Sequence, residues 1–261
     1  MTVCPRIPLE ILYLVVHKSD RPTLAVLLRT TTALSREAKP LFFASISVAS
    51  AASMVSLSRA LAQGQFQSSW LRRLHVIYPP VHLPPFSNVT SLRWSVSPFS
   101  TGAFSPSTLR DAMSSFPSLV ALALYGGPRT SHELDVVLSP VAPMLQTLEL
   151  IFHAPFAIST STFWAHFPAL RELIFADGFA CDLGAFLGTF RAVPPIEVLR
   201  VPAFCSWETL RRILPLFASS LRVLDVDVLT SVEMYSERHA LCFVKGMNHR
   251  RSTGRGGVVS C

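Results

Sequence analysis

Apolar residues recur along most of the chain with one spacing, in which a first apolar residue is followed by others three and five positions later. The clearest copy is LQTLEL, Leu145–Leu150, and six further copies share its spacing. The last two apolar positions are two residues apart and, in a strand, point to the same side of the sheet, so we expect them to face inward. The seven copies are Leu71-Leu74-Val76, Val89-Leu92-Trp94, Leu119-Leu122-Leu124, Leu145-Leu148-Leu150, Leu170-Leu173-Phe175, Ile196-Leu199-Val201 and Leu221-Leu224-Val226.

The intervals between successive copies predict a repeat protein. Their starts are separated by 18, 30, 26, 25, 26 and 25 residues, and the last four intervals resemble the period of leucine-rich repeats, about 20 to 29 residues. Four copies also have a proline two residues before their first apolar residue, where it ends the preceding helix and favours an extended neighbour. These prolines are Pro117, Pro143, Pro168 and Pro194.

The segments between the strands predict short helices with polar N-caps, except for the short gap before the second copy, where PPVHLPPFSNV predicts a loop. The helical segments are SPSTLRDAMSSF, SHELDVVLSPVA, STSTFWAHF, CDLGAFLGTF and SWETLRRILPLFASS, and the expected N-caps are Ser107, Ser131, Asp182 and Ser206. Stacked units bury a core that no single unit can bury. The resemblance therefore implies an α/β fold for residues 69–235: a leucine-rich-repeat solenoid of about seven degenerate repeats, with a curved parallel sheet and helices on its convex side.

The chain before the repeats is predicted to be helical. Pro8 suits the first turn of a helix, and the residues after it form one wide apolar stripe. Thr23 is placed to cap a second helix that runs toward Pro40. Residues 49–68 predict a helical connector to the repeats. The stripe consists of Ile11, Leu12, Val15 and Val16, and the connector places Met54, Leu57 and Leu61 on one face.

Residues 1–48 resemble an F-box. The resemblance lies in I-P-x-E-I-L at Ile7–Leu12, in Asp20 with Thr23-Leu24, and in Ala38-x-Pro40-Leu41-Phe42. It implies that this segment docks a Skp-family adaptor of a cullin-based (SCF) ubiquitin ligase, while the rest of the chain selects the substrate. The whole chain resembles F-box proteins with degenerate leucine-rich repeats, of the kind common in basidiomycete fungi. The adaptor-binding residues implied are Pro8, Glu10, Ile11, Leu12, Leu24 and Leu27. The alternative interpretation is an amphipathic helical cap for the repeats.

The outward positions of the strands are the candidate surface for a protein substrate, because they alternate with the buried ones. The charges along this row change from basic in the first two repeats to mixed in the later ones, and exposed Arg and aromatic residues are common anchors of protein interfaces. A solvated face that binds nothing is the alternative. The candidates are Arg73, His75, Arg93, Tyr125, Glu149, Glu172, Arg200, Asp225 and Asp227, and Ile151 and Pro202 are also expected to point outward.

Composition narrows the classes of partner and compartment. The net charge is +7, but the basic residues are scattered and form no tract of five, which argues against nucleic acid. Five cysteines without a C-x-x-C pair fit a reducing compartment, the cytoplasm or the nucleus. The N-terminal apolar run lacks the cleavage site of a signal peptide. The most hydrophobic window, Val136–Ile158, contains prolines and Glu149, which favours buried core over a membrane span.

Motifs of catalysis are missing from the sequence. The eight histidines form neither H-E-x-x-H nor zinc spacing with cysteines, and no nucleophile elbow or phosphate-binding glycine loop is found. We therefore expect no enzyme activity, no cofactor and no bound metal. His132 and Glu133 are interpreted as the start of a helix, where acidic residues are favoured.

The repeat pattern ends at Asp227, and residues 236–261 are predicted to be an irregular basic tail. The tail has three interpretations: a genuine cap, a flexible tail, or a reading frame that is truncated or runs into unrelated sequence, which we favour. For the whole chain, the first functional hypothesis is a substrate-recognition adaptor of an SCF-type ligase. The second is a leucine-rich-repeat interaction scaffold without a ligase link, and the third is a nucleic-acid-associated protein that uses the positive charge.

Overall fold

The computed structural model describes residues 8–77, 86–96, 105–151, 156–158, 166–175, 183–190, 192–202, 205–226, 248–250 and 257–260. The helices are α1 (Leu9–Lys18), α2 (Arg21–Leu27), α3 (Thr32–Phe42), α4 (Ala51–Ala62), α5 (Pro106–Met113), α6 (Ser131–Leu138), α7 (Leu183–Gly188) and α8 (Trp207–Ile213), with 3-10 turns η1 (Ser68–Trp70) and η2 (Leu214–Phe217). The strands are β1 (Ser45–Val48), β2 (Arg73–Val76), β3 (Ser91–Ser95), β4 (Ala121–Tyr125), β5 (Thr147–Ile151), β6 (Glu172–Phe175), β7 (Val198–Val201), β8 (Val223–Val226), β9 (Asn248–Arg250) and β10 (Gly257–Ser260).

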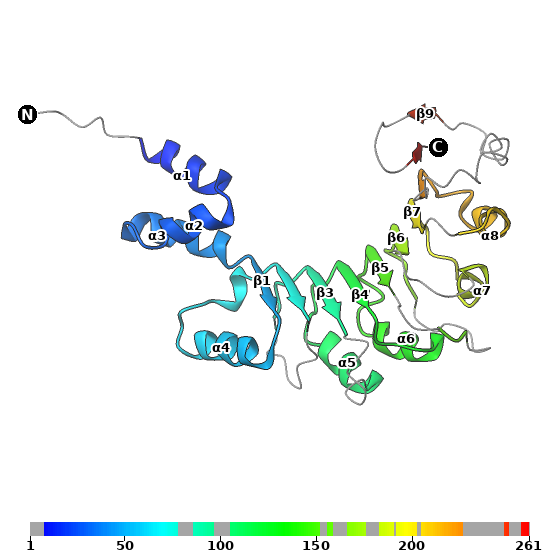
Figure 1. The fold of residues 1–261 in the computed structure, drawn as a ribbon, viewed down its shortest axis with the longest axis horizontal. Helices are drawn as coiled ribbons and strands as arrows, with labels where there is room; N and C mark the ends of the chain where they lie inside the picture. The colour runs from blue at the N-terminus through cyan, green and yellow to red at the C-terminus, as the bar shows by residue number, and fades with distance from the viewer. Residues whose placement is uncertain are drawn as a thin grey trace, which may run out of the picture.

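Eight parallel strands, β1 to β8, form one sheet in chain order, and each pairs with the next. Figure 1 shows the strands along the inner side of an arc, α4 to α8 on its outer side, and α1 to α3 beyond β1. Each of the seven predicted repeat copies forms one of these strands, β2 to β8, so the prediction of an α/β fold with a parallel sheet is confirmed, and the order of the strands is compatible with a repeat.

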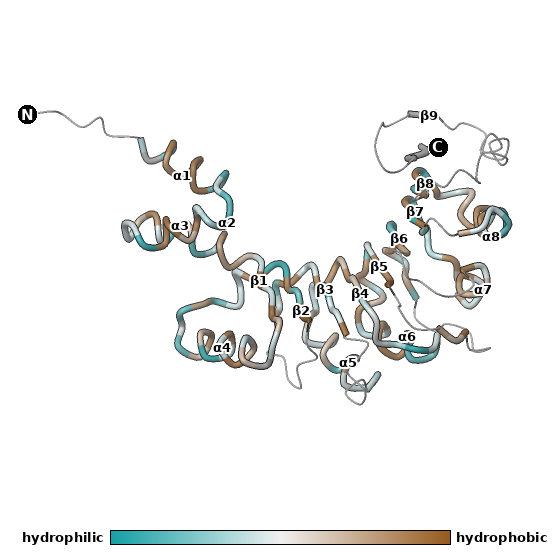
Figure 2. The backbone as a smooth tube through the Cα atoms, viewed as in Figure 1, coloured by the Kyte–Doolittle hydropathy of each residue, from teal (hydrophilic) through white to brown (hydrophobic). Residues whose placement is uncertain are grey.

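The inward residues of the strands form the centre of the core. Figure 2 shows hydrophobic and hydrophilic positions mixed along the strands, as expected when one face is buried and the other is not. The fourth position of every copy lies in register with that of the next strand, and each of these residues from β2 to β8 is buried. This leucine column consists of Leu74, Leu92, Leu122, Leu148, Leu173, Leu199 and Leu224.

The sheet begins earlier than the sequence predicted. Strand β1 lies inside residues 1–48, which were assigned to the N-terminal helical segment, and pairs with β2 through Ile46 and Leu74. Phe43, Ile46 and Val48 carry the repeat spacing with no leucine, which is why the pattern was not recognised. The predicted connector is helix α4, and its Met54 and Leu57 are buried in the same core as the strands.

The N-terminal helices have a small core of their own, built from Val16, Leu24 and Ala38. The helix expected to start at Thr23 is two helices, because the first ends at Leu27 and the hydroxyl of Thr31 caps the second. The cap of α2 is not Thr23 but Asp20, whose carboxylate accepts a hydrogen bond of 3.0 Å from the backbone N–H of Thr23. Hydrogen bonds from Thr23 also lower the pKa of Asp20.

Aromatic side chains join this small core to the large one. Phe42 packs against the helical cluster, and the adjacent Phe43 packs against the sheet core. Their ring centroids are 5.1 Å apart, and Phe43 lies 5.3 Å from Phe66 and 6.2 Å from Trp70. Such ring pairs contribute about 0.5–1.5 kcal/mol each beyond their buried area.

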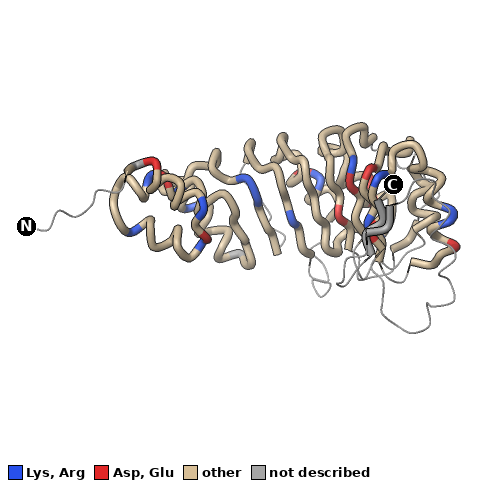
Figure 3. The backbone as a smooth tube through the Cα atoms, turned by 90° about the horizontal axis from the view of Figure 1, so that it is seen from above, with Lys and Arg blue, Asp and Glu red and all other residues tan. Residues whose placement is uncertain are grey.

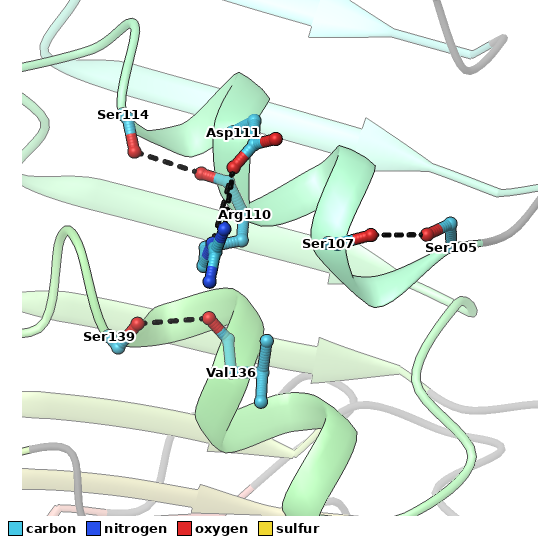
Figure 4. Close-up of polar contacts among 7 residues, drawn as sticks. All are labelled: Ser105, Ser107, Arg110, Asp111, Ser114, Val136 and Ser139. Carbon is cyan, nitrogen blue, oxygen red and sulfur yellow. Dashed lines mark hydrogen bonds and ion pairs between the residues drawn. The ribbon is translucent and has the colours of Figure 1, made fainter.

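Hydroxyl side chains bond to the backbone at the ends of several outer helices. The predicted N-cap Ser206 accepts from the N–H of Thr209, whereas α5 and α6 begin one or two residues earlier than expected, at the caps Ser105 and Thr130 rather than Ser107 and Ser131. Several hydroxyl side chains near the start of each helix can cap it, so the sequence alone placed the N-caps imprecisely. The hydroxyls of Ser114 and Ser139 donate to the last-turn carbonyls of Arg110 and Val136, as Figure 4 shows. The predicted cap Asp182 and most of STSTFWAHF lie outside the described residues.

The tail is not irregular throughout. Strand β10 pairs antiparallel with β8, and β9 pairs antiparallel with β10, so the sheet continues beyond the last repeat. Both strands lie in residues 236–261, which were predicted to lack regular structure. The repeat spacing does not find them, because both are short and β10, which pairs with the last repeat strand, runs antiparallel to it. Pairing of this kind satisfies the hydrogen-bonding groups that an edge strand would otherwise expose.

One glycine allows three neighbouring strands to meet at their carboxyl ends. Gly126, directly after β4, has φ +75, and a Cβ there would lie 2.8 Å from the carbonyl oxygen of Val96. Its N–H donates to the carbonyl of Ile151 at 2.6 Å. No other residue type fits this position without strain, because a side chain would clash and the left-handed conformation is unfavourable.

Replacement of Gly126 is therefore expected to destabilise the protein. We predict that Gly126→Ala lowers the free energy of unfolding by about 2–4 kcal/mol, the sum of left-handed strain and a backbone clash. Gly64→Ala is the matched control, because Gly64 has φ +67 and no atom within 4 Å of its added Cβ, and should lose only about 1 kcal/mol. Urea unfolding of both variants measures the difference. Equal losses would show that the contact with Val96 costs nothing.

Candidate protein-interaction surfaces

Helix α1 exposes three large apolar side chains on one side. Ile11, Leu14 and Val15 are 52%, 60% and 50% exposed, and their spacing of i, i+3 and i+4 places them on one face of a helix. The opposite side of α1 packs through Val16, which is buried in the small helical core. We call Ile11, Leu14 and Val15 the α1 strip. Clustered apolar residues of this kind mark interaction sites more often than isolated ones do.

The structure places the six predicted adaptor-binding residues in different environments. Pro8, Glu10 and Ile11 are exposed on the first turn of α1 or directly before it, and Leu12 is half-buried. Leu24 is only 6% exposed and packs inside the helical core. Leu27 is half-buried and also packs against that core.

Two residues of the α1 strip, Leu14 and Val15, were not among the adaptor-binding residues predicted from the sequence. Leu14 and Val15 follow Ile11 at helical spacing, and this spacing was the signal that could have found them. Val26 on α2 is also exposed. Figure 2 shows hydrophobic residues along much of α1. A helix that is apolar on more than its packed side is expected to be covered by another element or a partner.

The outward residues of the strands form two polar clusters. In the first, the hydroxyl of Tyr125 donates to Oε1 of Glu149 at 3.0 Å, and the guanidinium of Arg93 lies 5.0 Å from the centre of the Tyr125 ring. Nη2 of Arg93 is 4.0 Å from Oε2 of Glu149. His75 lies beside Arg93 in register, and its Nε2 is 3.4 Å from the hydroxyl of Ser95.

Burial and charge shift two pKa values in the first cluster. The pKa of His75 lies below its ordinary value, because burial disfavours the charged ring and the nearby Arg93 cation opposes it further. The pKa of Tyr125 lies above its ordinary value, because of burial first and the Glu149 carboxylate second, while Arg93 acts in the opposite direction. Both groups are therefore neutral at pH 7.

The second cluster lies on β5 to β8. Nη2 of Arg200 is 3.2 Å from Oε1 of Glu172, and its Nε is 3.9 Å from Oδ2 of Asp225. The hydroxyl of Thr147 donates to Oε2 of Glu172 at 3.2 Å. At the start of the strands, Glu197 pairs with both Arg171 and Arg222, at 3.4 and 3.5 Å. Half-exposed pairs contribute little stability each, but here they match each acidic group with a cation.

Four residues of the predicted face are not part of these clusters. Arg73 is exposed on β2 and makes no ion pair with the described residues, and Asp227 lies outside them. Ile151 and Pro202 were expected to point outward, but both are buried. They are at the end of β5 and directly after β7, where the regular alternation of inward and outward residues ends.

The described segments contain few other features that indicate a function. None of their helices is long and apolar enough to cross a membrane, and no group of three His, Cys, Asp or Glu among these residues is arranged to hold a metal ion. Burial raises the pKa of the Cys205 thiol to about 11, so it is protonated at neutral pH. No protein-family model and no curated protein matches the chain. The α1 strip and the strand face are therefore the surfaces from which function is inferred.

Removal of the Arg93 charge is expected to raise two pKa values together. In Arg93→Met, we predict that the pKa of His75 rises toward its ordinary value and that of Tyr125 rises further, because a nearby cation lowers both. NMR titration of His75 and ultraviolet titration of Tyr125 measure the shifts. Arg73→Met is the control and should change neither value, because Arg93, and not Arg73, is among the charges that shift the pKa values of His75 and Tyr125. Unchanged values in Arg93→Met would contradict the close approach of these side chains.

Proposed function

We propose that the protein is a substrate-recognition adaptor of an SCF-type ubiquitin ligase. The N-terminal helices are an F-box that docks a Skp-family adaptor and thereby a cullin scaffold, and the sheet with its helices is a leucine-rich-repeat solenoid that holds a protein substrate. Catalysis belongs to the partner proteins, and this chain contributes proximity. The assembly works in the cytoplasm or the nucleus, where unpaired cysteines persist.

The α1 strip is the observation that carries this proposal. The helical unit already has its own core, so Ile11, Leu14 and Val15 are not needed to hold it together. Covering a large apolar side chain completely contributes about 1.5–3 kcal/mol. Each of the three is about half exposed, so a partner that covers the strip gains about 3 kcal/mol in total. A second protein with a complementary apolar groove suits such a strip.

The position of the strip relative to the sheet supports a role as an adaptor. Figure 1 shows α1 to α3 at one end of the arc, beyond β1, and the inner side of the sheet is separate from them. A ligase component bound at α1 leaves the strand face free for a second partner. The alternative, an interaction scaffold without a ligase link, uses the strand face alone and gives the α1 strip no partner.

Capture of a Skp-family adaptor tests the proposal. Tagged protein is expected to capture the adaptor, and Ile11→Asp with Leu14→Asp is expected to reduce capture at least tenfold, because about 1.4 kcal/mol corresponds to a factor of ten. Val55→Asp is the matched control, because Val55 lies on α4 rather than α1. Its side chain is 56% exposed, close to the exposed fractions of Ile11 and Leu14, 52% and 60%. Circular dichroism checks that all variants are folded.

Two outcomes contradict the proposal. Wild-type protein that is folded and captures no Skp-family adaptor leaves only the interaction scaffold. Equal loss of capture in the Val55→Asp control shows that the adaptor does not dock on α1.

A further inference from the structure

Acidic residues are missing from one continuous part of the chain. Between Ala38 and Arg110, a stretch of 73 residues, the sequence has no Asp and no Glu. This stretch contains strands β1, β2 and β3. Figure 3 shows blue and no red on β2 and β3, whereas the later strands carry both colours close together. The cationic residues of this 73-residue stretch are Lys39, Arg59, Arg72, Arg73, Arg93 and Arg110.

The outward face of the first three strands is therefore basic and rich in hydroxyls. Arg73 and Arg93 are exposed there, and half-buried His75 lies two residues after Arg73 on β2 and pairs in register with Arg93 on β3. We call the outward residues of β1 to β3 the basic strip. They are Ser45, Ser47, Arg73, His75, Ser91, Arg93 and Ser95, and each is exposed or half-buried.

The cations of the basic strip have spare binding capacity. Arg73 makes no ion pair or side-chain hydrogen bond with the described residues, and the two segments that follow β2 and β3, residues 78–85 and 97–104, contain no acidic residue. The only described carboxylate near Arg93 is that of Glu149, at 4.0 Å, and a guanidinium has five N–H donors. On β5 to β8, by contrast, Arg200 already lies between Glu172 and Asp225.

We propose that an extended acidic segment of a protein partner docks across the basic strip, with carboxylates on Arg73 and Arg93. This inference rests on the proposed function, because it names the chemistry of the substrate that the strand face holds. Pairing of a guanidinium with a carboxylate forms charge-assisted hydrogen bonds, which are about twice as strong as neutral ones. The serine hydroxyls beside these cations accept or donate bonds to the backbone of the segment.

The spacing of the two cations fits an extended chain. Arg73 lies in register with Ser91, and Arg93 is two residues further along β3. Diagonal positions of this kind are roughly 7–8 Å apart. Side chains at alternate positions of an extended segment are about 7 Å apart, so acidic residues separated by one residue reach both cations.

Nucleic acid suits the strip less well. Single-stranded nucleic acid is held by bases stacked on open aromatic faces, and the one described aromatic side chain next to the strip on this face, Tyr125, has Arg93 over its ring. Two cations also provide few of the phosphate contacts on which such binding depends.

Binding of a labelled peptide of alternating glutamate and serine tests the inference. Fluorescence anisotropy at low salt is expected to show that this peptide binds. Analogues with glutamine or lysine in place of glutamate are expected not to bind. Arg73→Ser with Arg93→Ser should weaken binding by at least about tenfold, and Arg73→Ser alone should weaken it by a smaller factor without altering the contacts of Tyr125. The control, Arg59→Ser with Arg211→Ser, removes two exposed cations from the outer helices α4 and α8 and should change affinity less than about twofold.

Three outcomes overturn the inference: the glutamate peptide does not bind, the control pair weakens binding as much as the strip variant, or a single-stranded DNA oligonucleotide binds more tightly than the peptide through Arg73. Adaptor capture through α1 is measured separately on the same variants. In the wild-type protein, capture of the adaptor without any binding of the glutamate peptide rejects the acidic segment alone, whereas peptide binding without capture rejects the ligase link alone.

Discussion

The stacking of inward side chains between neighbouring strands is the constraint on which the rest of the structure depends. One strand with its helix is too small to bury its own apolar face. Leu148 is shielded from water only because Leu122 and Leu173 lie in register on either side of it. This register also aligns the outward residues of successive strands. The same constraint that builds the core therefore brings charged side chains 25 or more residues apart in the sequence within contact distance.

The N-terminal helices do not follow this constraint. They have a separate core, joined to the sheet through the aromatic contacts of Phe42 and Phe43. Because the small helical core meets the large sheet core at one junction, α1 can present apolar side chains to solvent without weakening the stack of strands. The arrangement separates two tasks: an apolar surface at the end of the arc and a polar, charged surface along its inner side. Docking at one leaves the other accessible.

Sequence predicted the seven repeat strands because the apolar spacing is periodic and is repeated at nearly constant intervals. It missed β1, whose Phe43, Ile46 and Val48 keep the spacing without leucine. It placed most charged residues of the strand face on the correct side, but the pairing of Arg200 with Glu172 and Asp225 depends on register, which a single sequence does not contain. The burial of Leu24 and the exposure of Leu14 likewise depend on how three short helices pack.

Amide hydrogen exchange with and without a Skp-family adaptor tests the central claim, that the chain has two separate binding surfaces with different partners. Adaptor binding is expected to slow exchange in α1 and α2 and to leave β2 to β4 unchanged, because only backbone groups at a covered surface or in elements stabilised by it gain protection. Adding the glutamate–serine peptide to that complex should then slow exchange in β2 and β3 alone. Protection of the strands by the adaptor, or no change in α1, would contradict the separation of the two surfaces.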